Sequence, residues 1–176
     1  MRIIAGTHRG ARIAAPKGVR TRSPVGRVRE AAFNLIGSVD GAAVLDVFAG
    51  SGALGLEALS RGAASVTFVE SDRAACQAIS QNLEKLELTG ARVVCADAVW
   101  AVRQDARTYD LILVDPPYEA WSALEAKLAR HLPRLLAPGG LLVVETGARV
   151  DPALPLPIRT SRRYGSARLT LFEPPG

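Results

Sequence analysis

The sequence contains few cysteines and histidines. Its two cysteines, Cys76 and Cys95, and its two histidines, His8 and His131, are scattered along 176 residues. Neither cysteine has a second cysteine or a histidine at the spacing that zinc sites use, so we expect no metal site. We interpret both cysteines as small core residues and both histidines as surface residues.

Long hydrophobic runs are also missing. The apolar runs at 111–114 and 141–144 are far shorter than the roughly 18 residues that suggest a membrane helix. The opening MRIIAGTHRG lacks the apolar centre and cleavage site of a signal peptide. We therefore expect a cytoplasmic protein without a membrane partner. A chain of 176 residues can bury a core without disulfides or metals, and we expect a monomer.

The positive charge is concentrated near the two ends of the chain. The net charge is +5, and residues 1–30 hold eight basic side chains against one acid, Glu30. These are Arg2, Arg9, Arg12, Lys17, Arg20, Arg22, Arg27 and Arg29, and a second cluster contains Arg159, Arg162, Arg163 and Arg168. Such a surface can serve solubility alone. Two basic blocks around a nearly balanced middle favour a nucleic-acid partner.

Residues 43–146 alternate short apolar runs with helical patterns, which predicts βαβ units and a parallel sheet. We expect strands at 44–48, 65–70, 92–95, 110–114 and 141–145, with a turn at Pro138-Gly139-Gly140 before the last. We expect helices at 27–36, 53–61, 122–132 and from an Asp72 cap to about residue 88. Hairpins are expected at 2–5 with 11–14 and at 158–161 with 167–172.

A glycine-rich loop, Gly50-Ser-Gly52-Ala-Leu-Gly55, follows the first strand, and Glu70 ends the second. This spacing fits a nicotinamide or flavin dinucleotide as well as S-adenosylmethionine, because an acid after the second strand can bind a ribose in either case. Asp46 would repel a pyrophosphate but could receive an ammonium group, which favours S-adenosylmethionine. Asp97, after the third strand, could bind an adenine amino group, cap the next helix, or do both.

The fourth strand ends in Asp115-Pro116-Pro117-Tyr118, at the sheet edge where such folds bind ligands. Two prolines stiffen this loop and remove two amide donors. A carboxylate, rigid carbonyls and an aromatic ring together suit a planar base that carries an amino group. Trp121 could flank that base, although we favour a packed helix residue.

Taken together, these residues resemble the bacterial methyltransferases that form N2-methylguanosine in 16S ribosomal RNA of the small subunit. The resemblance rests on the opening Met1–Gly6 with Arg9-Gly10, on Arg27–Asn34, on Phe48–Arg61, on Val69–Asp72, on Val114–Tyr118 and on Tyr164-Gly165. It implies a Rossmann-like class I methyltransferase, with a mostly parallel seven-stranded sheet and helices on both faces. It also implies a small basic N-terminal hairpin, residues 1–26, ahead of a methyltransferase domain, residues 27–176.

The resemblance further implies site residues and a partner. Cofactor contacts are expected from Asp46, Ala49, Gly50, Ser51, Gly52, Glu70, Ser71, Asp97 and Ala98, and catalysis at Asp115, Pro116, Pro117 and Tyr118. RNA contacts are expected from Arg9, Arg12, Arg22, Arg27 and Arg29. The implied substrate is an assembled or partly assembled small ribosomal subunit.

One segment departs from the family. Before Arg27 the family usually carries Arg-Pro-Thr-Thr/Ser-Asp, whereas this chain has Arg22-Ser-Pro-Val-Gly26. Hydroxyls and an acid are therefore missing, which leaves open a shifted loop, a weaker activity or an altered target. Three other functions also stay open: methylation of an amino group on a DNA base, methylation of a protein glutamine, and RNA binding by a degenerate methyltransferase core.

Overall fold

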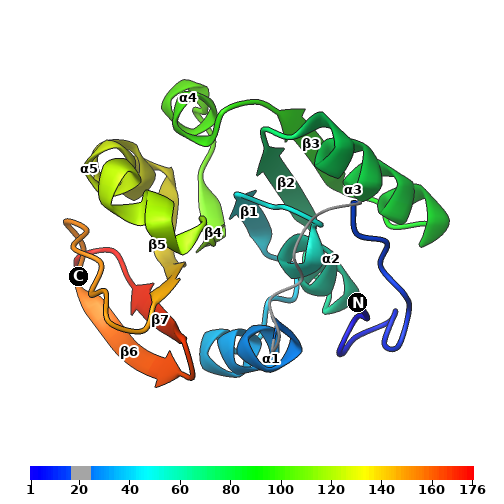
Figure 1. Cartoon of the computed structure of the whole chain (residues 1–176), viewed down its shortest axis with the longest axis horizontal. Coiled ribbons are helices and arrows are strands. Elements are labelled where there is room, and N and C mark those ends of the chain that lie inside the picture. The colour runs from blue at the N-terminus through cyan, green and yellow to red at the C-terminus, as the bar shows by residue number, and fades with distance from the viewer. Residues whose placement is uncertain (17–24) are drawn as a thin grey trace.

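The computed structural model describes residues 1–16 and 25–176, and its centre is a seven-stranded sheet in the order β3-β2-β1-β4-β5-β7-β6 (Figure 1). The strands are β1 Ala43–Val47, β2 Ser65–Glu70, β3 Ala91–Cys95, β4 Tyr109–Val114, β5 Leu136–Gly147, β6 Ile158–Tyr164 and β7 Ala167–Phe172. Strands β1 to β5 pair in parallel, while β7 runs antiparallel to both β5 and β6. The expected mostly parallel sheet with a terminal hairpin is confirmed.

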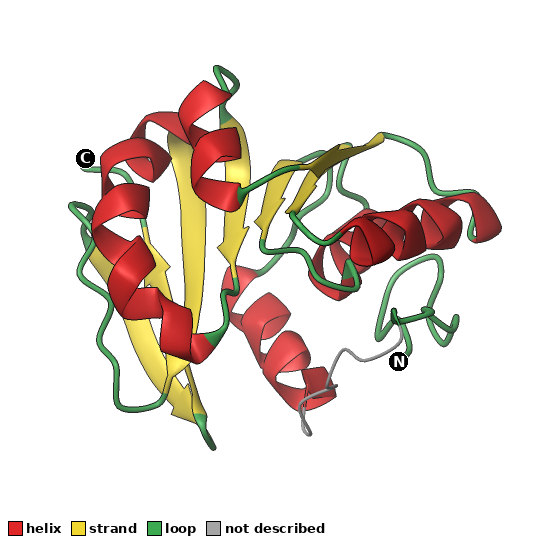
Figure 2. Cartoon of the chain, turned by 45° about the horizontal axis from the view of Figure 1, so that its top comes forward, coloured by secondary structure: helices red, strands yellow, loops and turns green. Residues whose placement is uncertain are grey.

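Helices cover both faces of this sheet, as Figure 2 shows from a second side. They are α1 Val25–Ile36, α2 Ala53–Ser60, α3 Arg73–Lys85, α4 Ala98–Gln104 and α5 Trp121–His131. The helices α1, α2 and α3 lie on one face, and α4 and α5 lie on the other (Figure 1). Asp72 caps α3 as expected, by accepting a hydrogen bond from the backbone N–H of Ala74.

Each face has its own apolar core. Phe33 of α1, Leu56 of α2 and Ile79 of α3 are buried in the first core. Trp121 and Leu128 of α5 are buried in the second. Trp121 is 2% exposed, so it is a packed helix residue and not a residue that flanks a base. Within the described ranges, no helix combines the length and apolar character that crossing a membrane requires.

The N-terminal segment forms a narrow hairpin with one antiparallel bridge, between Arg2 and Arg12, where we expected two short strands. It closes because the N–H of Gly10 donates to the carbonyl of Ile3 and the N–H of Ile13 donates to that of Met1. Ile3 and Ile13 are buried in the same core as α1 and α2. The hairpin is therefore packed against the sheet domain (Figure 1).

The prediction that a turn at Pro138-Gly139-Gly140 precedes the fifth strand was wrong, because β5 already begins at Leu136. The pairing of β4 with β5 shifts register here: Tyr109 faces Leu136, but Leu111 faces Leu141. The extra residues form a bulge in which Gly139 adopts a φ of 72°. The irregularity thus lies inside the strand.

Candidate active site

A cavity of about 380 Å³ opens at the carboxyl ends of β1, β2, β4 and β5. Ligands of open α/β sheets bind at this edge. The expected site residues that line it are Ala49, Gly50, Ser51, Glu70, Ser71, Asp115, Pro117 and Tyr118. The N-terminal hairpin contributes Met1, α1 contributes Val28, Arg29 and Ala32, and β5 contributes Val143 and Glu145. The sheet therefore brings the glycine loop and the Asp115–Tyr118 loop to one cavity.

The glycine loop passes close to its neighbours. Gly52 has a φ of 80°, and a side-chain carbon there would lie 2.9 Å from Ile79. At Gly55, such a carbon would lie 2.2 Å from the ring of Phe68. Both positions therefore require glycine, the first for its left-handed backbone and the second for close packing of α2 on β2. This packing fixes where the loop enters the cavity.

Asp46, at the end of β1, is 1% exposed. Its Oδ2 accepts a hydrogen bond of 2.9 Å from the backbone N–H of Gly55. Its Oδ1 is buried without a hydrogen-bond partner in the described parts of the chain. Burial raises the pKa of this carboxyl to about 7, although the hydrogen bond from Gly55 opposes the shift. Asp46 is buried next to the loop and is not among the lining residues of the cavity.

Glu70 reaches the cavity from the end of β2 and also fixes the loop. Its Oε2 accepts a hydrogen bond of 2.7 Å from the N–H of Gly50, and its Oε1 accepts one of 2.8 Å from the N–H of Asp72. Asp97 lies elsewhere: it is exposed, does not line the cavity, and accepts a hydrogen bond from the N–H of Trp100. Asp97 is thus the cap of α4, with Ala98 buried behind it.

The Asp115–Tyr118 loop lies opposite the glycine loop. Asp115 and Tyr118 are half-buried, Pro116 is buried and Pro117 is exposed. The Tyr118 hydroxyl donates a hydrogen bond of 2.7 Å to Oε1 of Glu145. Glu145 was not among the expected site residues, although the sequence carries a signal for it. Glu145 ends the expected fifth strand just as Glu70 ends the second, and the carboxyl ends of parallel strands meet at one edge.

The expected RNA-binding arginines fall into three groups. Arg9, Arg12 and Arg27 are exposed. Arg22 lies outside the described residues. Arg29 is 4% exposed, so it is not a surface cation and we correct its expected role. In the C-terminal cluster, Arg159, Arg162 and Arg163 are exposed, while Arg168 is buried and pairs with Asp151 at 3.0 Å.

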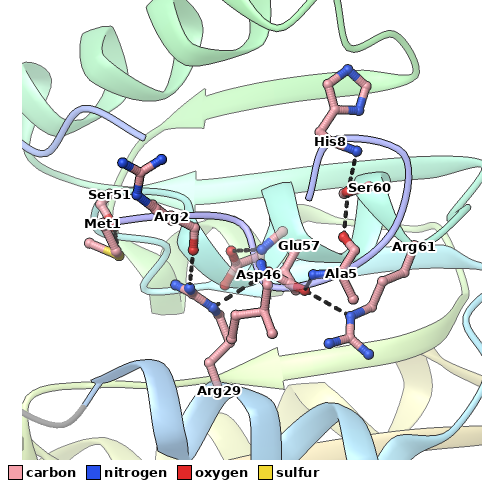
Figure 3. Close-up of polar contacts among 12 residues, drawn as sticks. Met1, Arg2, Ala5, His8, Arg29, Asp46, Ser51, Glu57, Ser60 and Arg61 are labelled. Atoms are coloured by element: carbon pink, nitrogen blue, oxygen red, sulfur yellow. Dashed lines mark hydrogen bonds and ion pairs between the residues drawn. The ribbon is translucent and has the colours of Figure 1, made fainter. Parts of the chain in front are cut away.

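Arg29 belongs to a buried network that holds the hairpin against α2 (Figure 3). Its guanidinium donates to the carbonyl of Arg2 and lies 3.6 Å from the carboxylate of Glu57. Glu57 is fully buried and also accepts from the side chain of Arg61 at 2.9 Å. Burial lowers the pKa of Arg29, while Glu57 opposes that shift. Nη1 of Arg29 is buried without a hydrogen-bond partner among the described residues.

Two residues differ from their expected surroundings. His8 is half-buried. Its backbone N–H donates to the side chain of Ser60 (Figure 3). Its ring forms a hydrogen bond of 2.9 Å with the carbonyl of Leu86, at the end of α3. It therefore fastens the hairpin to two helices and is not a simple surface residue. Cys76 is buried as expected, but Cys95 is exposed, because β3 is the edge strand of the sheet.

The sheet order, the glycine loop after β1 and the Asp-Pro-Pro-Tyr loop after β4 define a class I methyltransferase fold. The chain belongs to the family described as Conserved hypothetical protein 95, which its sequence matches over residues 1–173. Together with the relatives described next, this match confirms the resemblance to bacterial small-subunit rRNA methyltransferases at the level of the family.

Individual proteins agree with this assignment. The chain is 44% identical to Ribosomal RNA small subunit methyltransferase D of Escherichia coli over 119 residues, which are 67% of this chain and 60% of that relative. It is 39% identical to YlbH of Bacillus subtilis, provisionally named an rRNA methyltransferase, over 86% of this chain and 85% of the relative. A solved structure of yhhF from Escherichia coli, provisionally named a methyltransferase, superposes with a TM-score of 0.89 at 35% identity, covering 100% of this chain and 99% of the other.

Proposed function

We propose that this protein transfers a methyl group from S-adenosylmethionine to the exocyclic N2 amino group of a guanine in 16S rRNA. We propose an assembled or partly assembled small ribosomal subunit in the cytoplasm as the substrate. The observation that carries the proposal is the cavity, which joins the glycine loop to Asp115–Tyr118. The rRNA methyltransferases among the relatives support the choice of substrate.

Two buried atoms support the choice of cofactor. Buried polar atoms in proteins nearly always have hydrogen-bond partners. Oδ1 of Asp46 and Nη1 of Arg29 have none in the described parts of the chain. The methionine end of S-adenosylmethionine carries an ammonium and a carboxylate, the groups that would complement them. We therefore assign the ammonium to Asp46 and the carboxylate to Arg29.

Other residues would hold the rest of the cofactor. Glu70 and Ser71 line the cavity at the end of β2, where a carboxylate suits the ribose hydroxyls. Ala49–Gly52 would surround the methionine end with backbone groups. Asp97 and Ala98, at the end of the neighbouring strand β3, stay our candidates for the adenine.

The protein's contribution to the chemistry would be mainly alignment. When bound, the cofactor supplies a methyl group on a positively charged sulfur. The lone pair of a base amino group is delocalised into the ring and is a poor nucleophile. By accepting the two amino hydrogens, Asp115 and the carbonyl of Pro116 would let the nitrogen become pyramidal and direct its lone pair at the methyl carbon. As the new nitrogen–carbon bond forms, the bond between the methyl carbon and sulfur would break and leave a neutral thioether, and Asp115 would take up the proton released from the amino nitrogen.

RNA would bind across the exposed arginines of the N-terminal hairpin and α1. Arg9, Arg12 and Arg27 are exposed, and the hairpin that carries the first two is fixed to α2. Because this basic surface is already fixed, it can neutralise phosphates with little loss of conformational entropy on binding. The target base must leave its stack to enter the cavity, where Tyr118 offers an aromatic face.

Methyl transfer to several substrates in parallel tests this proposal. Small ribosomal subunits without the modification, naked 16S rRNA and duplex DNA are incubated with labelled S-adenosylmethionine, and the products are digested to nucleosides. The proposal predicts N2-methylguanosine from the ribosomal samples. Label in DNA alone would indicate that the protein methylates a DNA base. Cofactor binding without any methyl transfer would indicate an RNA-binding protein with a degenerate methyltransferase core.

A further inference from the structure

We infer that Glu145 is a specificity-determining residue, whose carboxylate recognises guanine by accepting a hydrogen bond from its N1–H group. This inference rests on the proposed function, because it assumes that a base enters the cavity with its amino group leading. It goes further in naming the group that would distinguish guanine from adenine and cytosine. Three observations carry it: the position of Glu145, its contact with Tyr118 and the charge of the cavity.

Glu145 lies beside the residue proposed to accept the amino hydrogens. In the sheet, Val114 of β4 is the parallel partner of Val144 of β5. The next residues, Asp115 and Glu145, therefore follow at the same level of neighbouring strands, which lie about 4.8 Å apart. Both side chains line the cavity and both are half-buried. A base whose amino group reaches Asp115 would thus place the adjacent ring atom near Glu145.

Tyr118 orients this carboxylate. Its hydroxyl donates to Oε1 of Glu145 at 2.7 Å, and its ring lies 3.6 Å from where a side-chain carbon of residue 147 would be. That is an ordinary van der Waals distance, so the ring packs beside β5 at Gly147. A carboxylate can accept about four hydrogen bonds. The bond from Tyr118 therefore orients the Glu145 carboxylate, which has acceptor positions besides the one that Tyr118 uses.

The chemistry of the base edge then decides which base fits. In guanine, the carbon that carries the N2 amino group lies between N1, which carries a hydrogen, and N3, which carries a lone pair, and the Watson–Crick edge presents N1–H beside the amino group. On the same edge of adenine and cytosine, the ring nitrogen beside the amino group carries a lone pair. A carboxylate attracts the first arrangement and repels the second, and a site built for a hydrogen bond rejects strongly a ligand that lacks it. Among the side chains that line the cavity in the described parts of the chain, one is cationic, Arg29, and three are acidic, Glu70, Asp115 and Glu145, so the lining favours hydrogen-bond donors.

A comparison of guanine with 2-aminopurine at the target position tests the inference. 2-Aminopurine keeps the amino group but has a lone pair at N1. Semisynthetic 16S rRNA carrying either base is assembled into small subunits, and kcat/KM for methyl transfer is measured for each. We expect wild-type protein to prefer guanine strongly. Glu145→Gln should lower kcat/KM for guanine by about 30- to 100-fold and raise the relative use of 2-aminopurine, because the amide can donate to N1.

Three controls separate recognition from folding. Glu145→Asp keeps the charge, so it should lose activity but keep the preference for guanine. Glu173→Gln makes the same chemical change at an exposed residue near the C-terminus and should behave as wild type. Cofactor affinity, measured by calorimetry, should stay within a few fold in all three. If Glu145→Gln kept the wild-type preference for guanine over 2-aminopurine, this inference would be overturned but the proposed function would stand. If wild-type protein methylated no guanine, the proposed function would be overturned as well.

Discussion

Oδ2 of Asp46 accepts a hydrogen bond of 2.9 Å from the backbone N–H of Gly55, which ties the end of β1 to the first turn of α2. The glycine loop is the segment between these two residues. A buried carboxylate therefore determines how the loop closes, and its second oxygen has no partner among the described residues. This relationship makes Asp46 a residue whose charge opposes folding and, in our account, serves cofactor binding.

The first prediction concerns pH. Burial raises the pKa of Asp46 to about 7, so the carboxylate becomes neutral as the pH falls below that value. A neutral carboxyl cannot pair with an ammonium, and we expect the affinity for S-adenosylmethionine to fall by up to about tenfold per pH unit below 7. Calorimetric titrations from pH 5.5 to 8.5 measure this. An affinity that does not change with pH would contradict the role assigned to Asp46.

The second prediction is that Asp46→Asn stabilises the free protein while it weakens cofactor binding. The pKa in the folded state lies above the ordinary value of 3.8, so the folded protein binds the proton more tightly than the unfolded chain. Stability from this group is therefore lost as the pH rises from about 4 to about 7. At pH 8 the variant should gain on the order of 1–3 kcal/mol in the free energy of unfolding. Denaturant unfolding at pH 5 and pH 8 should show the larger gain at pH 8, and a less stable variant at pH 8 would count against this account.

The third prediction concerns the hairpin. Glu57 accepts hydrogen bonds from the backbone N–H groups of Ile4 and Ala5 and lies beside two arginines. Glu57→Ala would leave the buried guanidinium of Arg29 without its ion pair, and we expect a loss of about 3–5 kcal/mol in the free energy of unfolding. Hydrogen exchange at residues 3–5 should accelerate. Glu84→Ala, an exposed change on α3, is the matched control and should cost much less.

The fourth prediction concerns RNA. Replacing Arg9 and Arg12 together by alanine should weaken binding to 16S rRNA and flatten its dependence on salt, because fewer counterions are released. Filter binding between about 50 and 200 mM salt covers the useful range. The matched control replaces Lys127 and Arg130, which are exposed on α5, and removes the same charge. Equal salt slopes for the two double variants would assign Arg9 and Arg12 to solubility.

Much of the fold follows from local patterns in the sequence. The bounds of β2 and β7 match the expected ranges, because apolar runs between turn residues define them. The bulge in β5 was not predictable, since Pro138-Gly139-Gly140 looks like a turn when the pairing with β4 is unknown. Local pattern indicates where a strand lies, but its ends depend on its neighbour.

The site was predictable where an acidic residue stands at or just after the end of a predicted strand, as Glu70 and Asp115 do. It was not predictable where a contact joins distant segments. Arg29 looks like a surface cation until Glu57, on another helix, is seen beside it. The bond between Tyr118 and Glu145 likewise depends on the pairing of β4 with β5. Charged residues in such contacts cannot be told from solvated ones by their type alone.

Single-turnover methyl transfer by Asp115→Ala tests whether one cavity holds the cofactor and aligns the guanine. Labelled S-adenosylmethionine and unmodified small subunits are the reactants, and calorimetry on the same samples measures cofactor affinity. We expect transfer to guanine N2 to be abolished while the affinity for the cofactor stays within a few fold of wild type. Turnover at the wild-type rate by this variant would contradict this expectation.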